Sequence, residues 1–149
     1  MAYVEKSVLV MHSAEQMFRL VDDVESYAIF LPWCSHATLI FQDEITTIAS
    51  LHIDYHGVKQ QFTTENKKNF PHWMHIHLKD GPFNKLEGHW KFIPLNAQAC
   101  KVEFSLHYEF TNSLLERLIS PVFSYITSTF VDNFVARADK INSLSKGSP

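Results

Sequence analysis

Residues 101–110 read KVEFSLHYEF, with a polar side chain at every odd position and an apolar one at every even position. Residues 85–92, KLEGHWKF, repeat the alternation, with Gly88 standing among the apolar positions. A period of two is typical of an antiparallel strand that has one buried face and one solvated face. The two neighbouring segments therefore predict a hairpin at the centre of an antiparallel sheet.

Further segments extend this sheet. Alternation and β-branched residues predict strands at residues 3–11, 45–55, 58–66 and about 74–78. His56-Gly57 predicts a hairpin turn after the second of these, and Asp80-Gly81-Pro82 predicts the turn that ends the last. The complete sheet is expected to hold about six or seven strands.

Two short helices are expected after the first strand. Ser13 and Gln16 have the spacing of a capping box, in which each side chain accepts a hydrogen bond from the other residue's backbone N–H. Met17 and Val21 lie on the apolar stripe of this helix. A second helix covers about residues 24–31 and stops at Pro32, because proline cannot continue it.

The last third of the chain follows a helical period. Apolar residues recur at steps of three and four: Leu115, Ile119, Val122, Ile126, Phe130, Phe134, Ala138 and Ile141. Because proline is costly inside a helix, Ser120 and Pro121 are interpreted as the N-cap and first residue of a helix that runs to Leu144. A short helical turn from Asn112 precedes it, and residues 145–149 are expected to be a frayed tail.

This order of elements predicts an α+β fold in one domain, residues 1–149. An antiparallel sheet with one solvated face must cover its other face, and the long amphipathic helix is the element able to do so. The predicted architecture is a helix grip, in which a curved sheet wraps one long helix.

Four segments carry a family resemblance: VDDVESY at 21–27, FLPWC at 30–34, DGPF at 80–83, and the helix from Phe123 to Ala138. They resemble the coenzyme Q-binding START-domain family of the polyketide cyclase/dehydrase-like helix-grip superfamily, which includes bacterial ribosome-association toxins. The resemblance implies a helix-grip fold of the START or Bet v 1-like type and one of two roles. One is binding a polyprenyl quinone in support of respiratory electron transport, and the other is binding the large ribosomal subunit and blocking subunit joining.

Composition narrows the classes of function. The chain has 149 residues, is 46% hydrophobic and carries a net charge of −3, so DNA is not an expected partner. No apolar run approaches the roughly 20 residues that a membrane span needs. Because no export signal precedes the first strand, we expect a cytoplasmic protein, with any membrane contact peripheral at the inner face of the cell membrane.

Catalytic and metal-binding patterns are weak. His72, His75 and His77 lack the spacing of a zinc motif and are interpreted as the solvated face of a sheet. Cys34 and Cys100 fall in apolar surroundings and are interpreted as buried, inert thiols. No catalytic residue, metal or cofactor is predicted, and any ubiquinone would be a bound ligand.

The apolar side chains instead predict a ligand site. A curved sheet around one helix leaves an elongated space, and ligand pockets are mostly apolar with a few polar groups. The residues expected to line this cavity are Pro32, Trp33, Tyr55, Phe62, Met74, Leu86, Trp90, Phe92, Phe104, Leu106, Tyr108, Phe123, Ile126, Phe130 and Phe134. Gln60, Tyr55 and Tyr108 are candidate donors to quinone carbonyls.

Trp33 and the lysines bear on the choice of partner. Beside the pocket mouth, Trp33 would suit an interfacial anchor at a bilayer surface, whereas a Trp that packs the loop is the equal alternative. For rRNA contacts, Lys67-Lys68 is the only adjacent pair of basic residues, and Lys59, Lys79, Lys85 and Lys91 extend one face of the sheet.

The preferred hypothesis is a carrier of ubiquinone or a similar prenyl lipid that has no enzymatic activity. The alternative is a ribosome-association toxin, and a cyclase or dehydrase is a weaker third possibility. The identity of the ligand, the tail length, the oligomeric state and any antitoxin partner stay open.

Overall fold

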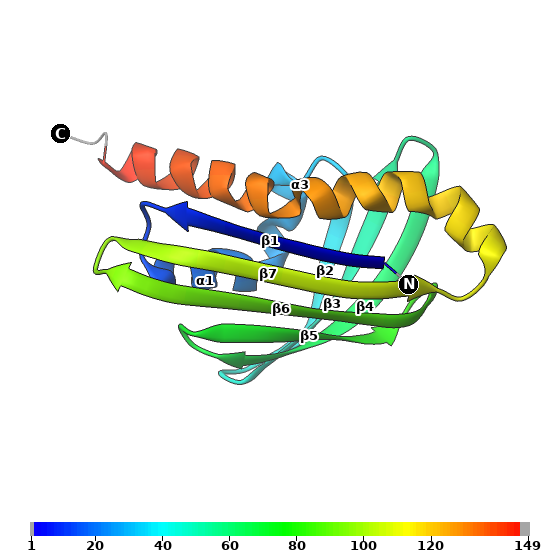
Figure 1. Ribbon diagram of the computed structural model, residues 1–149, viewed down its shortest axis with the longest axis horizontal. Coiled ribbons are helices and arrows are strands. Elements are labelled where there is room, and N and C mark those ends of the chain that lie inside the picture. Colours follow the sequence, from blue (N-terminus) through cyan, green and yellow to red (C-terminus); the bar gives the residue numbers. More distant parts are fainter. Residues whose placement is uncertain (1, 147–149) are drawn as a thin grey trace.

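A computed structural model of the protein describes residues 2–146 and confirms the helix-grip fold (Figure 1). Along the chain the elements are β1 (Ala2–Val10), α1 (Ala14–Asp22), the 3-10 turn η1 (Val24–Ser26), α2 (Tyr27–Phe30), β2 (Cys34–Gln42), β3 (Thr46–Tyr55), β4 (Val58–Asn69), β5 (Trp73–Asp80), β6 (Phe83–Asn96), β7 (Ala99–Phe110) and α3 (Ser113–Lys146).

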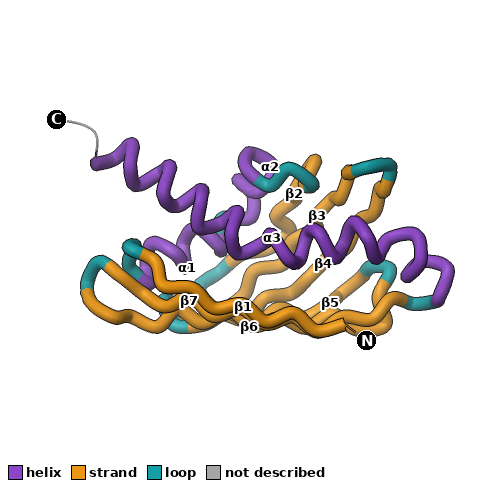
Figure 2. Tube along the Cα trace, turned by 45° about the horizontal axis from the view of Figure 1, so that its top comes forward, coloured by secondary structure: helices purple, strands orange, loops and turns teal. Residues whose placement is uncertain are grey.

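The strands form one seven-stranded sheet in the order β1-β7-β6-β5-β4-β3-β2, and every neighbouring pair is antiparallel. Helix α3 lies across the concave side of this sheet. Helices α1 and α2 lie beside the C-terminal half of α3 (Figure 2). The apolar face of the sheet and the apolar face of α3 are thereby turned toward each other.

The alternation that predicted β6 and β7 is confirmed. Leu86, Trp90, Phe104 and Leu106 are all buried on the concave side, and their polar neighbours in sequence face outward. The capping box at α1 is also present, with the Ser13 hydroxyl accepting from the Gln16 backbone N–H at 3.1 Å. Local pattern and global packing agree in these elements.

Strand β2 was not predicted. It is an edge strand in which Ile40 and Phe41 are exposed, and its pairing with β3 is shifted between Cys34 and His36 and between Leu39 and Phe41. Each irregularity reverses the side to which the following residues point. The sequence of β2 therefore lacks the period-two pattern by which the other strands are recognised.

The predicted start of the long helix was wrong. Helix α3 begins at Ser113, with the Asn112 side chain accepting from the Leu115 backbone N–H at 2.9 Å, and Pro121 lies inside it. Inside a helix, proline removes one hydrogen bond and crowds the preceding turn, so it bends the helix axis. The first turns of α3, yellow in Figure 1, accordingly run at an angle to the rest.

The end of α3 also differs from the prediction. Ile141, expected on the buried stripe, is 39% exposed. The C-terminal turns of α3 rise away from the sheet (Figure 2). The helix continues to Lys146, two residues beyond the predicted end at Leu144, and the rest of the predicted frayed tail lies outside the described residues.

Candidate functional site

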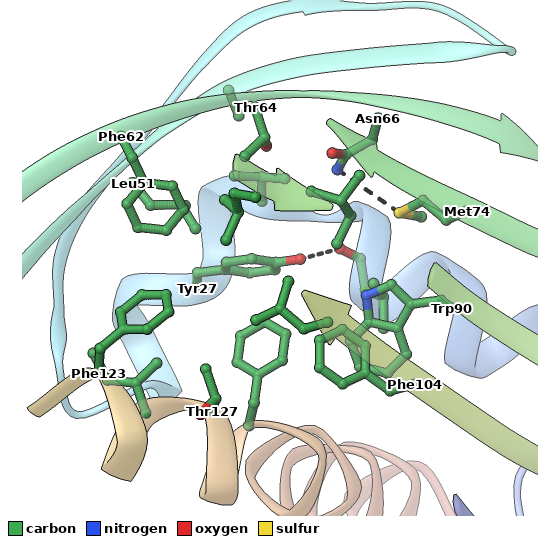
Figure 3. A pocket seen from close by; sticks show the side chains of 18 residues that line it. Tyr27, Leu51, Phe62, Thr64, Asn66, Met74, Trp90, Phe104, Phe123 and Thr127 are labelled. Carbon is green, nitrogen blue, oxygen red and sulfur yellow. Dashed lines mark hydrogen bonds between the residues drawn. The ribbon is translucent and has the colours of Figure 1, made fainter. Parts of the chain in front are cut away.

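A cavity of about 70 Å³ lies between the sheet and α3 (Figure 3). Strands β3 to β7 form its floor, residues from α1 to α2 close one side, and α3 covers it. The predicted residues that line it are Phe62, Met74, Leu86, Trp90, Phe104, Leu106, Phe123, Ile126 and Phe130. Whether they contact a ligand stays a prediction.

Trp33 and Pro32 do not line the cavity. Trp33 is only 1% exposed and lies against Phe130, with 6.2 Å between the ring centroids, while Pro32 is exposed in the preceding turn. The turn between α2 and β2 points the Trp33 ring inward, so the interfacial-anchor interpretation was wrong. The indole N–H has no protein acceptor in the structure.

The other predicted residues outside the lining lie farther along the same faces. Tyr55 stacks on Tyr125 at the outer end of β3, with 5.4 Å between centroids, and Tyr108 packs against Phe123 at 4.7 Å. Phe92 is covered by Phe18 of α1.

Phe134 is wedged beside Tyr27 and Trp90, at 5.2 and 5.5 Å. The concave face of the sheet is longer than the cavity, so facing inward does not suffice to reach it. Gln60 is also absent from the lining, so none of the three candidate donors lines the cavity, and whether any of them contacts a quinone stays a prediction.

Sequence reasoning missed half of the lining: Val21, Val24, Tyr27, Ala49, Leu51, Thr64, Asn66, Ile76 and Thr127. Ala49 and Leu51 lie on the buried face of β3, within the strand predicted at residues 45–55. Thr64 and Asn66 are in phase with the buried Phe62 along β4, and this phase was the available signal. Their polar character concealed it.

The polar lining groups are mostly engaged with protein atoms. The Tyr27 hydroxyl donates to the Val21 carbonyl, and burial strongly raises the pKa of this phenol. The Thr127 hydroxyl donates to the Ser124 carbonyl at 3.2 Å. Asn66 is 7% exposed, its amide nitrogen reaches only Met74 Sδ at 3.8 Å, and its Oδ1 has no partner (Figure 3).

A buried ionic network lies next to the cavity. Lys68 Nζ is 2.9 Å from Asp22 Oδ2, and the Lys68 side chain is only 3% exposed. Asp22 also accepts from Thr47 Oγ1 at 2.8 Å and Gln42 Nε2 at 3.2 Å. Lys68 is therefore unavailable for phosphate contacts, and the interpretation of Lys67-Lys68 as a basic patch was wrong.

The histidines and thiols show no reactive arrangement. His75 and His89 pair across β5 and β6 on the outer face, and within residues 2–146 no three His, Cys, Asp or Glu side chains could hold a metal. Cys34 and Cys100 are buried and unbonded to each other. Burial raises the pKa of Cys34 and raises that of Cys100 to about 11. No helix among the described residues has the length and apolarity needed to cross a membrane.

Residues 10–135 match the family described as polyketide cyclase / dehydrase and lipid transport. The chain belongs to this family. The match spans β2 to β7, α1, α2 and the part of α3 that covers the cavity, so it includes every residue that lines it.

Relatives in this polyketide cyclase / dehydrase and lipid transport family have names of two kinds. A ribosome association toxin RatA from Escherichia coli is 38% identical over 143 residues, which cover 96% of this chain and 90% of the toxin. The mitochondrial coenzyme Q-binding protein COQ10 homolog B from Xenopus laevis is 32% identical over 143 residues, covering 93% of this chain and 58% of that protein. The family resemblance read from the sequence is thereby confirmed.

Solved structures show the same fold at low identity. The Zhui aromatase/cyclase from a Streptomyces species superposes with a TM-score of 0.81 at 14% identity, covering 93% of this chain and 94% of that one. Such a likeness shows the fold alone. The relatives with substantial identity are named as toxins and coenzyme Q-binding proteins, whereas this cyclase is only a distant structural neighbour.

Proposed function

We propose that the protein binds a prenyl lipid, with ubiquinone as the leading candidate, in the cavity between the sheet and α3, and acts as a carrier without catalysing a reaction. The observation that carries this proposal is the composition of the cavity. Its walls are aliphatic and aromatic, with a buried amide that lacks a full set of hydrogen bonds. Ligand pockets typically combine an apolar lining with a few convergent polar groups.

A quinone ring requires this cavity to widen. An engineered protein cavity that binds benzene has a volume of about 150 Å³, and the present cavity is about 70 Å³. Among the lining residues only Ile76 and Phe130 are half-buried, so the cavity comes nearest to solvent at these side chains. Phe130 lies between Trp33 and Trp90, and its rotation away from them opens the space along α3.

Burial of the isoprenoid tail supplies the affinity. Apolar surface removed from water contributes about 25 cal/mol per Å², so each 100 Å² of tail contributes roughly 2.5 kcal/mol. The tail needs no hydrogen bonds, which fits a wall built from Leu86, Leu106, Phe104 and Ile126. The ring needs only one or two polar partners: the Thr64 hydroxyl can turn to donate to a carbonyl, and Asn66 Oδ1 can accept from a hydroxyl.

The first experiment is organic extraction of gently purified protein followed by mass spectrometry, with a stoichiometric prenyl lipid as the expected result. In solution, a ubiquinone with two isoprene units is expected to quench Trp90, which lines the cavity. Leu106→Trp fills the cavity and should abolish saturable quenching. Leu118→Trp adds the same bulk at an exposed position of α3 and should not. Equal quenching in the two variants contradicts the proposal.

Association with the large ribosomal subunit is the second candidate, favoured by the identity with RatA proteins over nearly the whole chain. The surface lysines give it little support, since Lys67 and Lys79 pair with Glu65 and Lys85 lies near Glu87. Salt-dependent co-sedimentation with large subunits tests it. If the Leu106→Trp variant still co-sediments with large subunits, the protein surface binds the ribosome and the cavity is not required.

A further inference from the structure

The inner face of β4 changes from apolar to polar along the strand. Phe62, Thr64, Asn66 and Lys68 are all buried and point to the concave side. Lys68 is neutralised by Asp22, and Phe62 packs in the aromatic core. Asn66 differs from both, because it borders the cavity and one of its polar atoms has no partner.

The Asn66 amide presents its oxygen for binding. The amide nitrogen donates to Met74 Sδ at 3.8 Å, and thioether sulfur is a weak acceptor, whereas Oδ1 has two free lone pairs (Figure 3). Turning the amide over would set Oδ1 against the sulfur and forfeit the N–H···S contact. The geometry therefore favours an acceptor, and an acceptor requires a ligand that donates.

Two other polar groups in the lining can also accept a hydrogen bond from a ligand but not donate one. The Tyr27 and Thr127 hydroxyls already donate to the carbonyls of Val21 and Ser124, which leaves only their oxygen lone pairs for a ligand. The Thr64 hydroxyl can turn to donate or to accept. The Trp90 indole N–H is a donor in the lining, but the acceptor oxygens of Asn66, Tyr27 and Thr127 outnumber it, although a quinone ring offers only acceptors.

We propose that the cavity selects a ring that carries a hydroxyl group, so that the reduced quinol binds more tightly than the quinone, with Asn66 as the acceptor. This inference rests on the proposed lipid-binding function. The phenolic O–H of a quinol completes the hydrogen bonding of Asn66, whereas a quinone carbonyl meets Oδ1 lone pair to lone pair. One net hydrogen bond corresponds to about tenfold in affinity.

The test compares a ubiquinone with two isoprene units and its two-electron-reduced ubiquinol in anaerobic calorimetry. Wild-type protein should bind the quinol about tenfold more tightly. Asn66→Leu, nearly equal in volume, should bring the quinol affinity to that of the quinone. Asn69→Leu, an exposed control on the same strand, should leave the preference intact.

The reduction potential of the bound quinone/quinol pair provides a second test that needs only wild-type protein. Because tighter binding of the reduced form raises the two-electron reduction potential of the bound pair, a tenfold preference corresponds to about 30 mV. Equal affinities, or a lower potential, would overturn the inference while leaving lipid binding in place. Failure of wild type to bind either form would overturn both.

Discussion

Replacing Lys68 by Met isolates the buried ionic network. Lys68 Nζ lies 2.9 Å from Asp22 Oδ2, and the two side chains are 3% and 18% exposed. Met keeps most of the buried aliphatic volume and removes the charge. Asp22 then remains as a largely buried carboxylate whose nearest donors are Thr47 and Gln42.

The expected destabilisation is about 3 kcal/mol. Removing one partner of a buried ion pair costs roughly 3–5 kcal/mol, and the two remaining donors to Asp22 place this case at the lower end. For a chain of this size each kcal/mol lowers Tm by about 3 °C, so a decrease of roughly 9 °C follows. Thermal unfolding followed by circular dichroism measures it.

The neighbouring lysine provides the control. Lys67 is 49% exposed and pairs with Glu65 at 2.9 Å on the outer face, so Lys67→Met should change stability by no more than about 0.5 kcal/mol. High salt should weaken the exposed Lys67 pair and have a smaller effect on the Lys68 pair, because mostly buried charges are screened much less.

A double variant tests the cause. Asp22→Asn removes the uncompensated charge and keeps an acceptor for Thr47, so it should destabilise wild-type protein but partly restore Lys68→Met. If Lys68→Met and Lys67→Met melt within about 1 °C of each other, the reasoning from burial is wrong.

Further predictions concern helix α3, the turn between β3 and β4, and the two buried cysteine thiols. Pro121→Ala should raise stability by about 1–2 kcal/mol in urea titrations, since Ala restores a helical hydrogen bond at an exposed position. Gly57→Ala should cost about 1 kcal/mol, because Gly57 has φ 82° and no atom lies within 4 Å of an added Cβ. Cys34 and Cys100 should react with a thiol reagent at pH 8 only after unfolding, because both are buried and have a raised pKa. Stability should fall as pH rises from about 9 to about 11, because the unfolded chain releases the protons of Cys100, Cys34 and Tyr27 before the folded protein does. Cys100→Ala should make that fall in urea midpoints smaller without removing it.

The sequence predicted the structure best where the alternation of residues along a strand matches the burial of one face of the sheet. Trp90 and Phe104 were placed correctly because β6 and β7 each have one wet and one buried face. Strand β2 was missed because its irregular pairing and edge position erase the alternation. Trp33 was misplaced because the direction of a side chain in a tight turn depends on dihedral angles that no periodicity reports.

The cavity shows a second limit of pattern reading. Its predicted residues were chosen for being apolar, and that criterion finds walls but not the polar groups that orient a ligand. Thr64, Asn66 and Lys68 continue the phase of Phe62, so their burial follows from the pleat of β4 and not from their chemistry.

Burying polar groups on β4 has to be offset by other interactions, and the chain does so for Lys68 with Asp22. For Asn66 the offset is only partial, because its amide nitrogen contacts Met74 Sδ and its Oδ1 has no partner. A buried amide left with a free oxygen beside a cavity is better explained by a ligand than by stability. The same strand therefore separates what holds the fold from what the proposed site binds, and the Lys68 and Asn66 variants should differ accordingly. Lys68→Met should lower Tm, whereas Asn66→Leu should change ligand preference at nearly constant Tm.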